Sequence, residues 1–570
     1  EIIKKEKKYV TDPTTGKVVS APEYGGTITM VWNSIPDTAR NYPTRHGQSL
    51  LGGVSEMLTM ADWGIDRSVF QHMNRPVPTW VMKGRLAESW EIKDDATTYE
   101  FTLRDDVNWH NKAPVNGRKF VANDVVVSYQ RYFGTTDLCE GDVIGQYKNI
   151  PLESITAPND TTVVFKLTQP HLTFLDDIFN AYPPHIQPPE SIEKECAIED
   201  WRDVTGTGPF ELAEVVKDTS ATWTKVAGYY GYDEKFPANR LPYVDELRAL
   251  EMPDDATRVS ALRTGKIEYL GWSGDTAQGI DTARALMKTN PEMTFIPYIY
   301  RSNGTSYSLN IRTAPFDDIR VRKAMQMALD LEAVNNAMFG GMAKWKPQGI
   351  MGDGSTEYFT PFDEWPEDIK KGYVYDPEGA EKLLDEAGYP RGDDGIRFTT
   401  KHELGTYWKD QPLADLAASY WKKIGVEVKV TNAPDNAALN AKIKAGEFEG
   451  MVGAYIGYDR NPSFMMSCYA RSDGGCNRPG TNDPAIDALI DAGLAATTYE
   501  QQQENYKEAD MMVIRDHHYV WFLKIPKYNI LNPWYVGYNG EYFLGFQQRY
   551  GQIHARIWID SEMRNSMVGR

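Results

Sequence analysis

The sequence predicts an α/β protein with more than one domain. Its 570 residues exceed what one hydrophobic core holds, because single cores stop growing at about 250–300 residues. Two stretches, residues 86–133 and 307–330, each contain a strand-like apolar segment followed by apolar residues at helical spacing. Strands followed closely by helices are typical of α/β folds.

The composition excludes two classes of partner. Lys and Arg total 61 against 80 Asp and Glu, a net charge of −19 that repels nucleic acid and anionic lipid. No apolar run approaches the roughly 20 residues of a membrane helix. Residues 1–22 are charged and poor in large apolar side chains, which indicates either a flexible stalk or a frayed terminus. The chain starts at Glu1 rather than Met, so a signal or lipid-anchor segment could precede it.

The elements of the first half follow from apolar spacing. Alternation predicts strands at Tyr24–Trp32, at Tyr99–Leu103 and at Asp160–Leu167, and helical spacing predicts helices at Ser49–Leu58 and from Ala122 to Phe133. The string GTGPF at residues 206–210 is not expected to bind phosphate, because a strand-like alternation follows it instead of a helix N-terminus.

The second half repeats the strand-then-helix order. A strand at Ser308–Ile311 precedes a helix capped by Asp317 or Asp318, and Asp376–Gly388 is expected to be a capped helix that ends at a glycine. Leu413–Gly425 predicts a helix followed by a strand, and the apolar run Tyr519–Ile525 predicts a buried strand.

Known catalytic and metal-binding motifs are missing. The chain contains no Gly-x-Ser-x-Gly, Walker, His-Glu-x-x-His or EF-hand sequence, so we expect no enzyme activity, metal or cofactor. A glycosidase carboxylate pair stays open, because its required separation is spatial. The four cysteines have no Cys-x-x-Cys spacing, which disfavours zinc. Cys468 with Cys476, and Cys139 with Cys196, are the expected disulfides, and free buried thiols are the alternative.

Several blocks resemble one protein family. LAESWEIKDDATTYEFTLRDDVNWHNKAPVNGRKFVANDVVVSYQRYF at 86–133 and YSLNIRTAPFDDIRVRKAMQMALD at 307–330 are similar to segments of the dipeptide- and oligopeptide-binding family 5 solute-binding proteins of ABC importers. Where that family has His-Asp-Gly-Thr-Pro, this chain has His-Asn-Lys-Ala-Pro at 110–114. The resemblance extends in matching order from about Tyr24 to about Ile525.

The resemblance implies a bilobal periplasmic-binding-protein-like fold of type II, in its large three-segment form, with a hinge between the lobes. The implied organisation is a stalk (1–22), three segments of lobe 1 (23–57, 205–300 and 526–570), a subdomain inserted into lobe 1 (58–204) and lobe 2 (301–525).

It also implies where a ligand binds. In peptide-binding members an aspartate pairs with the peptide ammonium, and alignment places Gly457 or Tyr458 there, with Asp459 one or two residues later. The expected ligand-binding residues are Trp32, Asn33, Gly271, Trp272, Ser273, Tyr307, Tyr455, Gly457, Tyr458 and Asp459.

The implied function is a receptor that captures an oligopeptide between closing lobes and delivers it to an ABC permease. It would be a monomer outside the cytoplasm, either in the periplasm or lipid-anchored to the outer face of the cell membrane. An oligosaccharide or another non-peptide solute is the alternative ligand, because the 15 tryptophans and 33 tyrosines of the chain supply many faces on which a sugar ring stacks. A secreted hydrolase on this scaffold is the third possibility.

Overall fold

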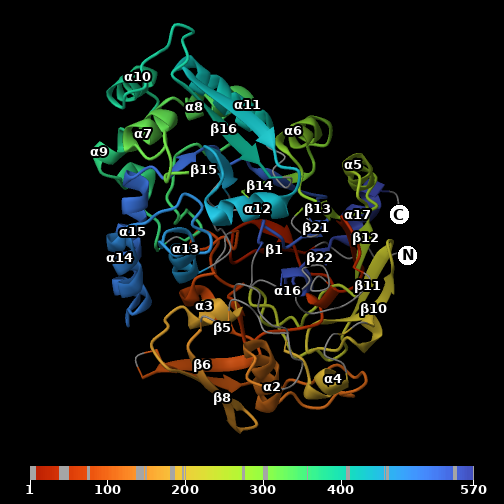
Figure 1. The fold of residues 1–570 in the computed structure, drawn as a ribbon. Coiled ribbons are helices and arrows are strands. Elements are labelled where there is room, and N and C mark those ends of the chain that lie inside the picture. Colours follow the sequence, from red (N-terminus) through yellow and green to blue (C-terminus); the bar gives the residue numbers. More distant parts are fainter. Residues whose placement is uncertain are drawn as a thin grey trace. The chain divides into compact units, whose positions relative to one another are not determined.

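The chain forms two compact units in the computed structural model. Unit 1 comprises Glu1–Tyr298 and Lys527–Arg570, and unit 2 comprises Ile299–Pro526. Each unit mixes helices with sheets, which confirms the expected α/β class (Figure 1). The structure describes residues 8–36, 50–73, 77–94, 96–136, 147, 150–179, 186–194, 198, 200–271, 276–299, 306–355, 357–405, 411–454, 456, 461–542 and 549–568.

One four-stranded sheet of unit 1 joins the start of the chain to its middle. Its strand order is β10-β11-β12-β3, with β12 and β3 parallel and the other pairs antiparallel. The alternation of Ile28 and Met30 correctly predicts a strand, and both side chains are buried. The strands are β3 (Thr27–Trp32), β10 (Phe210–Val216), β11 (Ser220–Lys225) and β12 (Glu246–Glu251).

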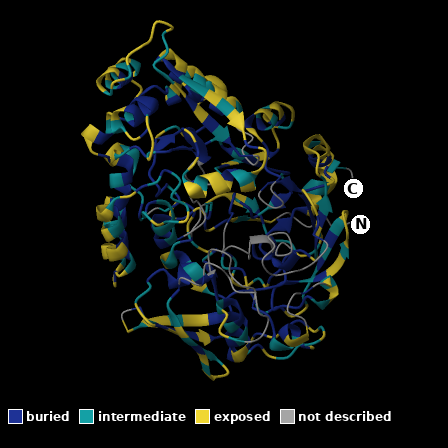
Figure 2. Cartoon of the chain, viewed as in Figure 1, coloured by how far each residue is buried: buried dark blue, intermediate teal, exposed yellow. Residues whose placement is uncertain are grey.

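A second four-stranded sheet, ordered β6-β7-β9-β8, is antiparallel throughout. Tyr99, Phe101 and Leu103 form its buried face, as their alternation predicts, and β6 carries many exposed residues (Figure 2). Helix α2 (Ala122–Phe133) packs on β8 and β9, and Asp124 accepts a hydrogen bond from the N–H of Val121 at its first turn. The strands are β6 (Ala87–Lys93), β7 (Thr98–Leu103), β8 (Leu152–Asn159) and β9 (Thr162–Leu167).

The remaining elements of unit 1 are short. The three-stranded sheet β13-β20-β14 consists of Tyr269–Leu270, Lys527–Leu531 and Thr294–Tyr298. Three two-stranded sheets pair β1 (Tyr9–Thr11) with β2 (Val18–Ser20), β4 (Thr59–Ala61) with β5 (Met82–Gly84), and β21 (Tyr535–Val536) with β22 (Trp558–Ile559). The helices are η1 (Thr79–Val81), α3 (Phe174–Phe179), α4 (Pro189–Lys194), η3 (Trp201–Asp203), α5 (Asp255–Arg263), α6 (Ile280–Thr289), α16 (Arg549–Ala555) and α17 (Ser561–Val568).

The helix expected over Ser49–Leu58 is wrong beyond Leu51. Of its described residues only Leu50 and Leu51 are helical. In a helix the carbonyl oxygen of Val54 would accept a hydrogen bond from the N–H of the residue four positions later. Here it accepts from the N–H of Gly208 at 2.7 Å, which belongs to a distant segment. A Cβ atom at Gly208 would lie 2.6 Å from that oxygen, which explains why this approach requires glycine.

Unit 2 is built around a five-stranded sheet ordered β17-β16-β18-β15-β19. Asp318 caps α7 and Asp376 caps α10, both as predicted. The strands are β15 (Ser306–Leu309), β16 (Phe398–Leu404), β17 (Val426–Asn432), β18 (Met451–Ala454) and β19 (Tyr519–Trp521). The helices are α7 (Ile319–Met327), α8 (Leu331–Phe339), η5 (Phe362–Glu364), α9 (Glu367–Lys370), α10 (Pro377–Glu386), α11 (Gln411–Lys423), α12 (Asn436–Ala445), α13 (Pro462–Tyr469), α14 (Pro484–Leu494) and α15 (Tyr499–Arg515).

The core of unit 2 lies beside this sheet. Trp421 of α11 is fully buried, and its indole N–H donates to the carbonyl oxygen of Met325 at 2.7 Å. Tyr307 of β15 and Leu384 of α10 belong to the same apolar cluster. Within the described ranges, no helix combines the length and apolarity that a bilayer-spanning segment needs.

Candidate functional site

Four strands of unit 2 end at the same edge of its sheet. β16, β17, β18 and β19 are parallel, and β15 runs against them. Ser306 pairs with both Ala454 and Trp521, so the start of β15 lies between the ends of β18 and β19. In open α/β sheets, ligands bind outside the carboxyl ends of the strands. This carboxyl edge is therefore the candidate binding edge of unit 2.

Of the ligand residues predicted in unit 2, the structure describes only Tyr307. Tyr307 is in β15, but its ring is buried and lies 4.4 Å from the ring of His402 and 6.0 Å from that of Trp421. Burial lowers the pKa of His402 to about 3, so this side chain is neutral at neutral pH. The other four predicted residues follow β18 but lie outside the described residues: Tyr455, Gly457, Tyr458 and Asp459.

Arg478 is a residue that the sequence interpretation missed. Its Nη1 donates to the carbonyl oxygen of Gly453 in β18 at 2.6 Å, which brings a partly buried guanidinium to the candidate edge. Asn477 fixes the turn that contains Arg478, because its side chain accepts hydrogen bonds from the N–H groups of Gly480 and Thr481. No local sequence signal marks Arg478, because its partner Gly453 lies 25 residues earlier in the chain.

A disulfide closes the loop that leads to Arg478. Cys468 in α13 is bonded to Cys476, which confirms that expected pair. The N–H of Cys476 also donates to the carbonyl oxygen of Cys468 at 2.9 Å. The second expected pair, Cys139 and Cys196, lies outside the described residues.

The predicted residues at the end of β3 have partners within unit 1. Trp32 is buried, and its ring lies 5.6 Å from that of Trp223. Asn33 is exposed, but its side-chain oxygen accepts a hydrogen bond from Arg258. Both side chains therefore make contacts that stabilise unit 1, and their role in binding a ligand stays a prediction.

A close contact of the backbone explains why residue 271 is a glycine. A Cβ atom there would lie 2.5 Å from Oδ1 of Asn529, so the backbone passes too close to β20 for a larger residue. Its carbonyl oxygen accepts a hydrogen bond from the N–H of Thr276 at 2.9 Å. Trp272 and Ser273, which follow it, lie outside the described residues.

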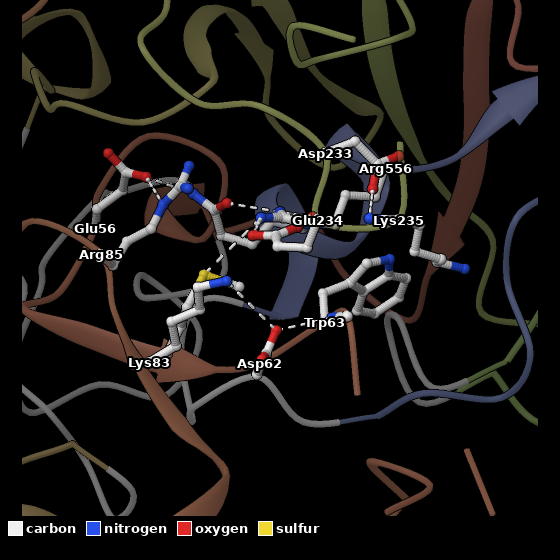
Figure 3. Close-up of polar contacts among 12 residues, drawn as sticks. Glu56, Asp62, Trp63, Lys83, Arg85, Asp233, Glu234, Lys235 and Arg556 are labelled. Atoms are coloured by element: carbon white, nitrogen blue, oxygen red, sulfur yellow. Dashed lines mark hydrogen bonds and ion pairs between the residues drawn. The ribbon is translucent and has the colours of Figure 1, made fainter. Parts of the chain in front are cut away.

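Buried ion pairs form a separate group in unit 1 (Figure 3). Arg85 pairs with Glu56 at 2.7 Å, and Arg556 pairs with Glu234 at 2.6 Å. Burial opposes the ionisation of Glu234, but the charge and hydrogen bonds of Arg556, together with the charge of Arg85, outweigh burial and lower the pKa of Glu234 to about 2. Each of these carboxylates is matched by a cation, so the group fastens distant segments of unit 1 together. The described residues contain no cluster of three or more His, Cys, Asp or Glu placed to hold a metal ion.

Comparison with known proteins points to one family. The model of "Bacterial extracellular solute-binding proteins, family 5 Middle" matches residues 81–476. Heme-binding protein A of Haemophilus influenzae is 28% identical and aligns over 82% of this chain and 83% of its own length. The dipeptide-binding protein of Escherichia coli is 26% identical over 75% of this chain and 78% of its own. The structure of a periplasmic binding protein, DppA, from Helicobacter pylori in complex with the peptide STSA superposes with a TM-score of 0.66 at 20% identity, covering 95% of this chain and 99% of that one.

Proposed function

Because this chain belongs to the bacterial extracellular solute-binding proteins of family 5, we propose that it is the receptor of an ABC importer and that its solute is an oligopeptide. The family name places such proteins outside the cytoplasm. In this proposal the receptor holds the solute between its two lobes and delivers it to the membrane permease without breaking a bond. Binding free energy then favours the closed conformation that the permease recognises.

The observation that carries the peptide proposal is the position of Arg478. A guanidinium is suited to a peptide's terminal carboxylate, because two parallel N–H donors match the two carboxylate oxygens. Arg478 is anchored to Gly453, two residues before the segment in which the family resemblance expects ligand contacts. A peptide could bind the rest of the edge through main-chain hydrogen bonds, as an added strand does. One of the relatives is named a dipeptide-binding protein, which is consistent with this chemistry.

A non-peptide solute is the second candidate. The position aligned with the ammonium-binding aspartate holds Gly457 or Tyr458, neither of which carries a charge. Another relative is named for heme rather than for a peptide. An oligosaccharide in the same site gains little support from Trp32, because that ring is buried against Trp223 rather than open for stacking.

Mass spectrometry of the solute that copurifies with the protein tests the proposal. Denaturing the purified receptor should release short peptides, and adding one of them to the refolded receptor should raise the melting temperature in proportion to the logarithm of its concentration. Recovery of only non-peptide solutes would overturn the peptide assignment. Shortening or hydrolysis of the added peptide during incubation would overturn the non-enzymatic role.

A further inference from the structure

The guanidinium of Arg478 is held through one of its three nitrogens. Its Nη1 donates to the carbonyl oxygen of Gly453, while the described residues supply no hydrogen-bond partner for Nε and Nη2 and no carboxylate that forms an ion pair with them. Nε and Nη2 are parallel donors that bind the two oxygens of a carboxylate side-on. A ligand carboxylate that binds there therefore displaces no described protein group.

A second arginine, Arg312, holds the backbone of the same residue. Arg312 lies three residues after β15, and its Nη1 donates to the carbonyl oxygen of Arg478 at 3.1 Å. The N–H of Ile311 donates to the carbonyl oxygen of Pro479, also at 3.1 Å, so the turn is tied to the end of β15 at two neighbouring positions. Residue 478 is therefore fixed through its carbonyl group to Arg312 and through its side chain to β18.

Two glycines leave room for the Arg312 side chain. A Cβ atom at Gly480 would overlap the guanidinium of Arg312, and one at Gly446 would lie 3.3 Å from its Nε. Gly446 is also the C-cap of α12, where the last carbonyl groups of the helix favour a cation. Arg312 is therefore packed between the end of α12 and the turn that contains Arg478.

The backbone that carries Arg312 is anchored as well. Asn310 is buried, and its side-chain nitrogen donates to the carbonyl oxygens of Gly446 and Phe448, at 3.1 and 2.7 Å. Its side-chain oxygen accepts a hydrogen bond from the N–H of Arg312 at 3.4 Å. Because these bonds fix the backbone at Arg312, its side chain holds the turn at a set distance from β15.

We propose that Arg312 is a positioning residue, which keeps Arg478 in the orientation that binds the terminal carboxylate of a peptide. This inference rests on the proposed function and adds to it a residue that acts through Arg478 rather than by contact with the ligand. Ordering a long side chain at the moment of binding lowers the affinity. When the turn is already held in the free receptor, less of that ordering remains for the ligand to cause, so the affinity is higher.

Titration calorimetry with a peptide and its C-terminally amidated form separates positioning from a general structural role. Arg312→Ala removes the hydrogen bond to the turn, and Arg312→Lys keeps a cation that can donate to the same carbonyl oxygen. Arg320→Ala is the matched control. Arg320 is another exposed arginine of unit 2 that donates to a backbone carbonyl group, that of Glu386 at 2.7 Å.

Arg312→Ala should weaken binding of the free-carboxylate peptide by about 3- to 10-fold, the usual effect of ordering one long side chain, and should leave the affinity for the amidated peptide unchanged. Arg312→Lys should restore part of the loss, and Arg320→Ala should bind both peptides as the wild type does. In the Arg478→Gln background, Arg312→Ala should have no further effect, because the guanidinium that it positions is absent.

The positioning role is overturned if Arg312→Ala leaves both affinities unchanged, if it weakens both peptides equally, or if its effect is as large in the Arg478→Gln background as in the wild type. If Arg478→Gln itself affects the two peptides equally, or if the wild type binds neither, then the peptide-carboxylate role of Arg478 fails and the positioning role fails with it. A selective effect of Arg478→Gln without any effect of Arg312→Ala overturns the positioning role alone, so the two failures are distinguishable.

Discussion

At the scale of single residues, Asp510 is a buried carboxyl group in the core of unit 2. Its oxygens accept hydrogen bonds from the N–H groups of Ile350 and Met351, at 2.7 and 3.2 Å. Burial raises the pKa of Asp510 to about 7 despite these bonds. An unfolded Asp titrates near pH 3.9, about three units lower, so between these values the native protein binds a proton that the unfolded chain has lost. This contribution to stability is complete below about pH 4 and is lost as the pH rises to 7.

The pH dependence can be measured against Asp510→Asn, which cannot titrate. Urea denaturation of both proteins from pH 4 to 8 should show the free-energy difference moving in favour of the variant by at most about 1.4 kcal/mol per pH unit. Four buried histidines have lowered pKa values and act in the opposite direction, but both proteins share them: His110, His402, His517 and His518. A difference that does not change with pH would contradict the prediction.

Arg478 provides a prediction about the ligand. Arg478→Gln should weaken binding of a peptide with a free terminal carboxylate by about 10- to 100-fold, the usual cost of losing a charged hydrogen-bond partner. The same substitution should hardly change the affinity for the corresponding amidated peptide, which lacks the negative charge. Titration calorimetry with the two peptides gives this comparison.

Arg471→Gln is the control for Arg478→Gln. Arg471 lies inside the disulfide loop that precedes Arg478, and it pairs with Asp473 at 2.7 Å and with Asp491, both on exposed surface. Its loss should leave both peptide affinities unchanged. If Arg478→Gln weakens the free and the amidated peptide equally, then Arg478 stabilises the edge and does not bind the carboxylate.

At the scale of elements, apolar periodicity predicts much of the secondary structure. Helix α2 begins at Ala122 as expected, since its capping carboxylate and apolar stripe are both local in sequence. The expected helix over Ser49–Leu58 fails because several of its carbonyl groups bond distant segments: those of Gly53 and Val54 accept from residues 210 and 208, and those of Met57 and Leu58 from residues 86 and 85. The role of Trp32 stays a prediction, and its contact with Trp223 depends on strand packing that periodicity does not encode. Arg478 was missed for the same reason, since its partner Gly453 is 25 residues away.

The disulfide loop provides the prediction for this scale. Replacing both Cys468 and Cys476 by Ser should destabilise unit 2 by about 2.5 kcal/mol, the chain-entropy value for so short a loop. Because Arg478 follows the loop by two residues, the variant should also bind a free-carboxylate peptide more weakly. Denaturation by urea and peptide titration measure the two effects.

A reducing agent is the control for that variant. Dithiothreitol should lower the stability of the wild type by more than that of the variant, because the variant has only the expected Cys139–Cys196 pair left to reduce. Equal stability of the oxidised wild type and the variant would show that the loop holds its shape without the covalent bond.

At the scale of the whole molecule, unit 1 is assembled from parts of the chain that are far apart in sequence. Its second segment, residues 527–570, contributes Glu541, which pairs with Arg67 at 2.8 Å. Lys235 donates to Asp12 at 2.8 Å and to the carbonyl oxygen of Gly537 at 3.3 Å, so one ammonium joins three segments. Sequence spacing cannot predict such pairs, because every charge in the chain is an equally plausible partner before the fold is known.

The pair of Lys235 and Asp12 tests whether these contacts hold unit 1 together. Both side chains are almost fully buried, so Lys235→Met leaves a carboxylate in the core without its cation and should cost about 3–5 kcal/mol of unfolding free energy. The double variant Asp12→Asn with Lys235→Met removes that lone charge and should recover part of the loss. Urea denaturation of the single and double variants gives the coupling energy.

A surface ion pair is the control, because breaking it removes the same lysine charge without leaving a buried carboxylate. Lys401 and Glu449 form an ion pair on the surface, and Lys401→Met should change stability by no more than about 1 kcal/mol. If Lys235→Met costs as little as Lys401→Met, then the buried pair does not fasten the N-terminal segment. If the double variant is no more stable than the Lys235→Met single variant, then the loss comes from packing of the lysine chain, and the ionised Asp12 is not its cause.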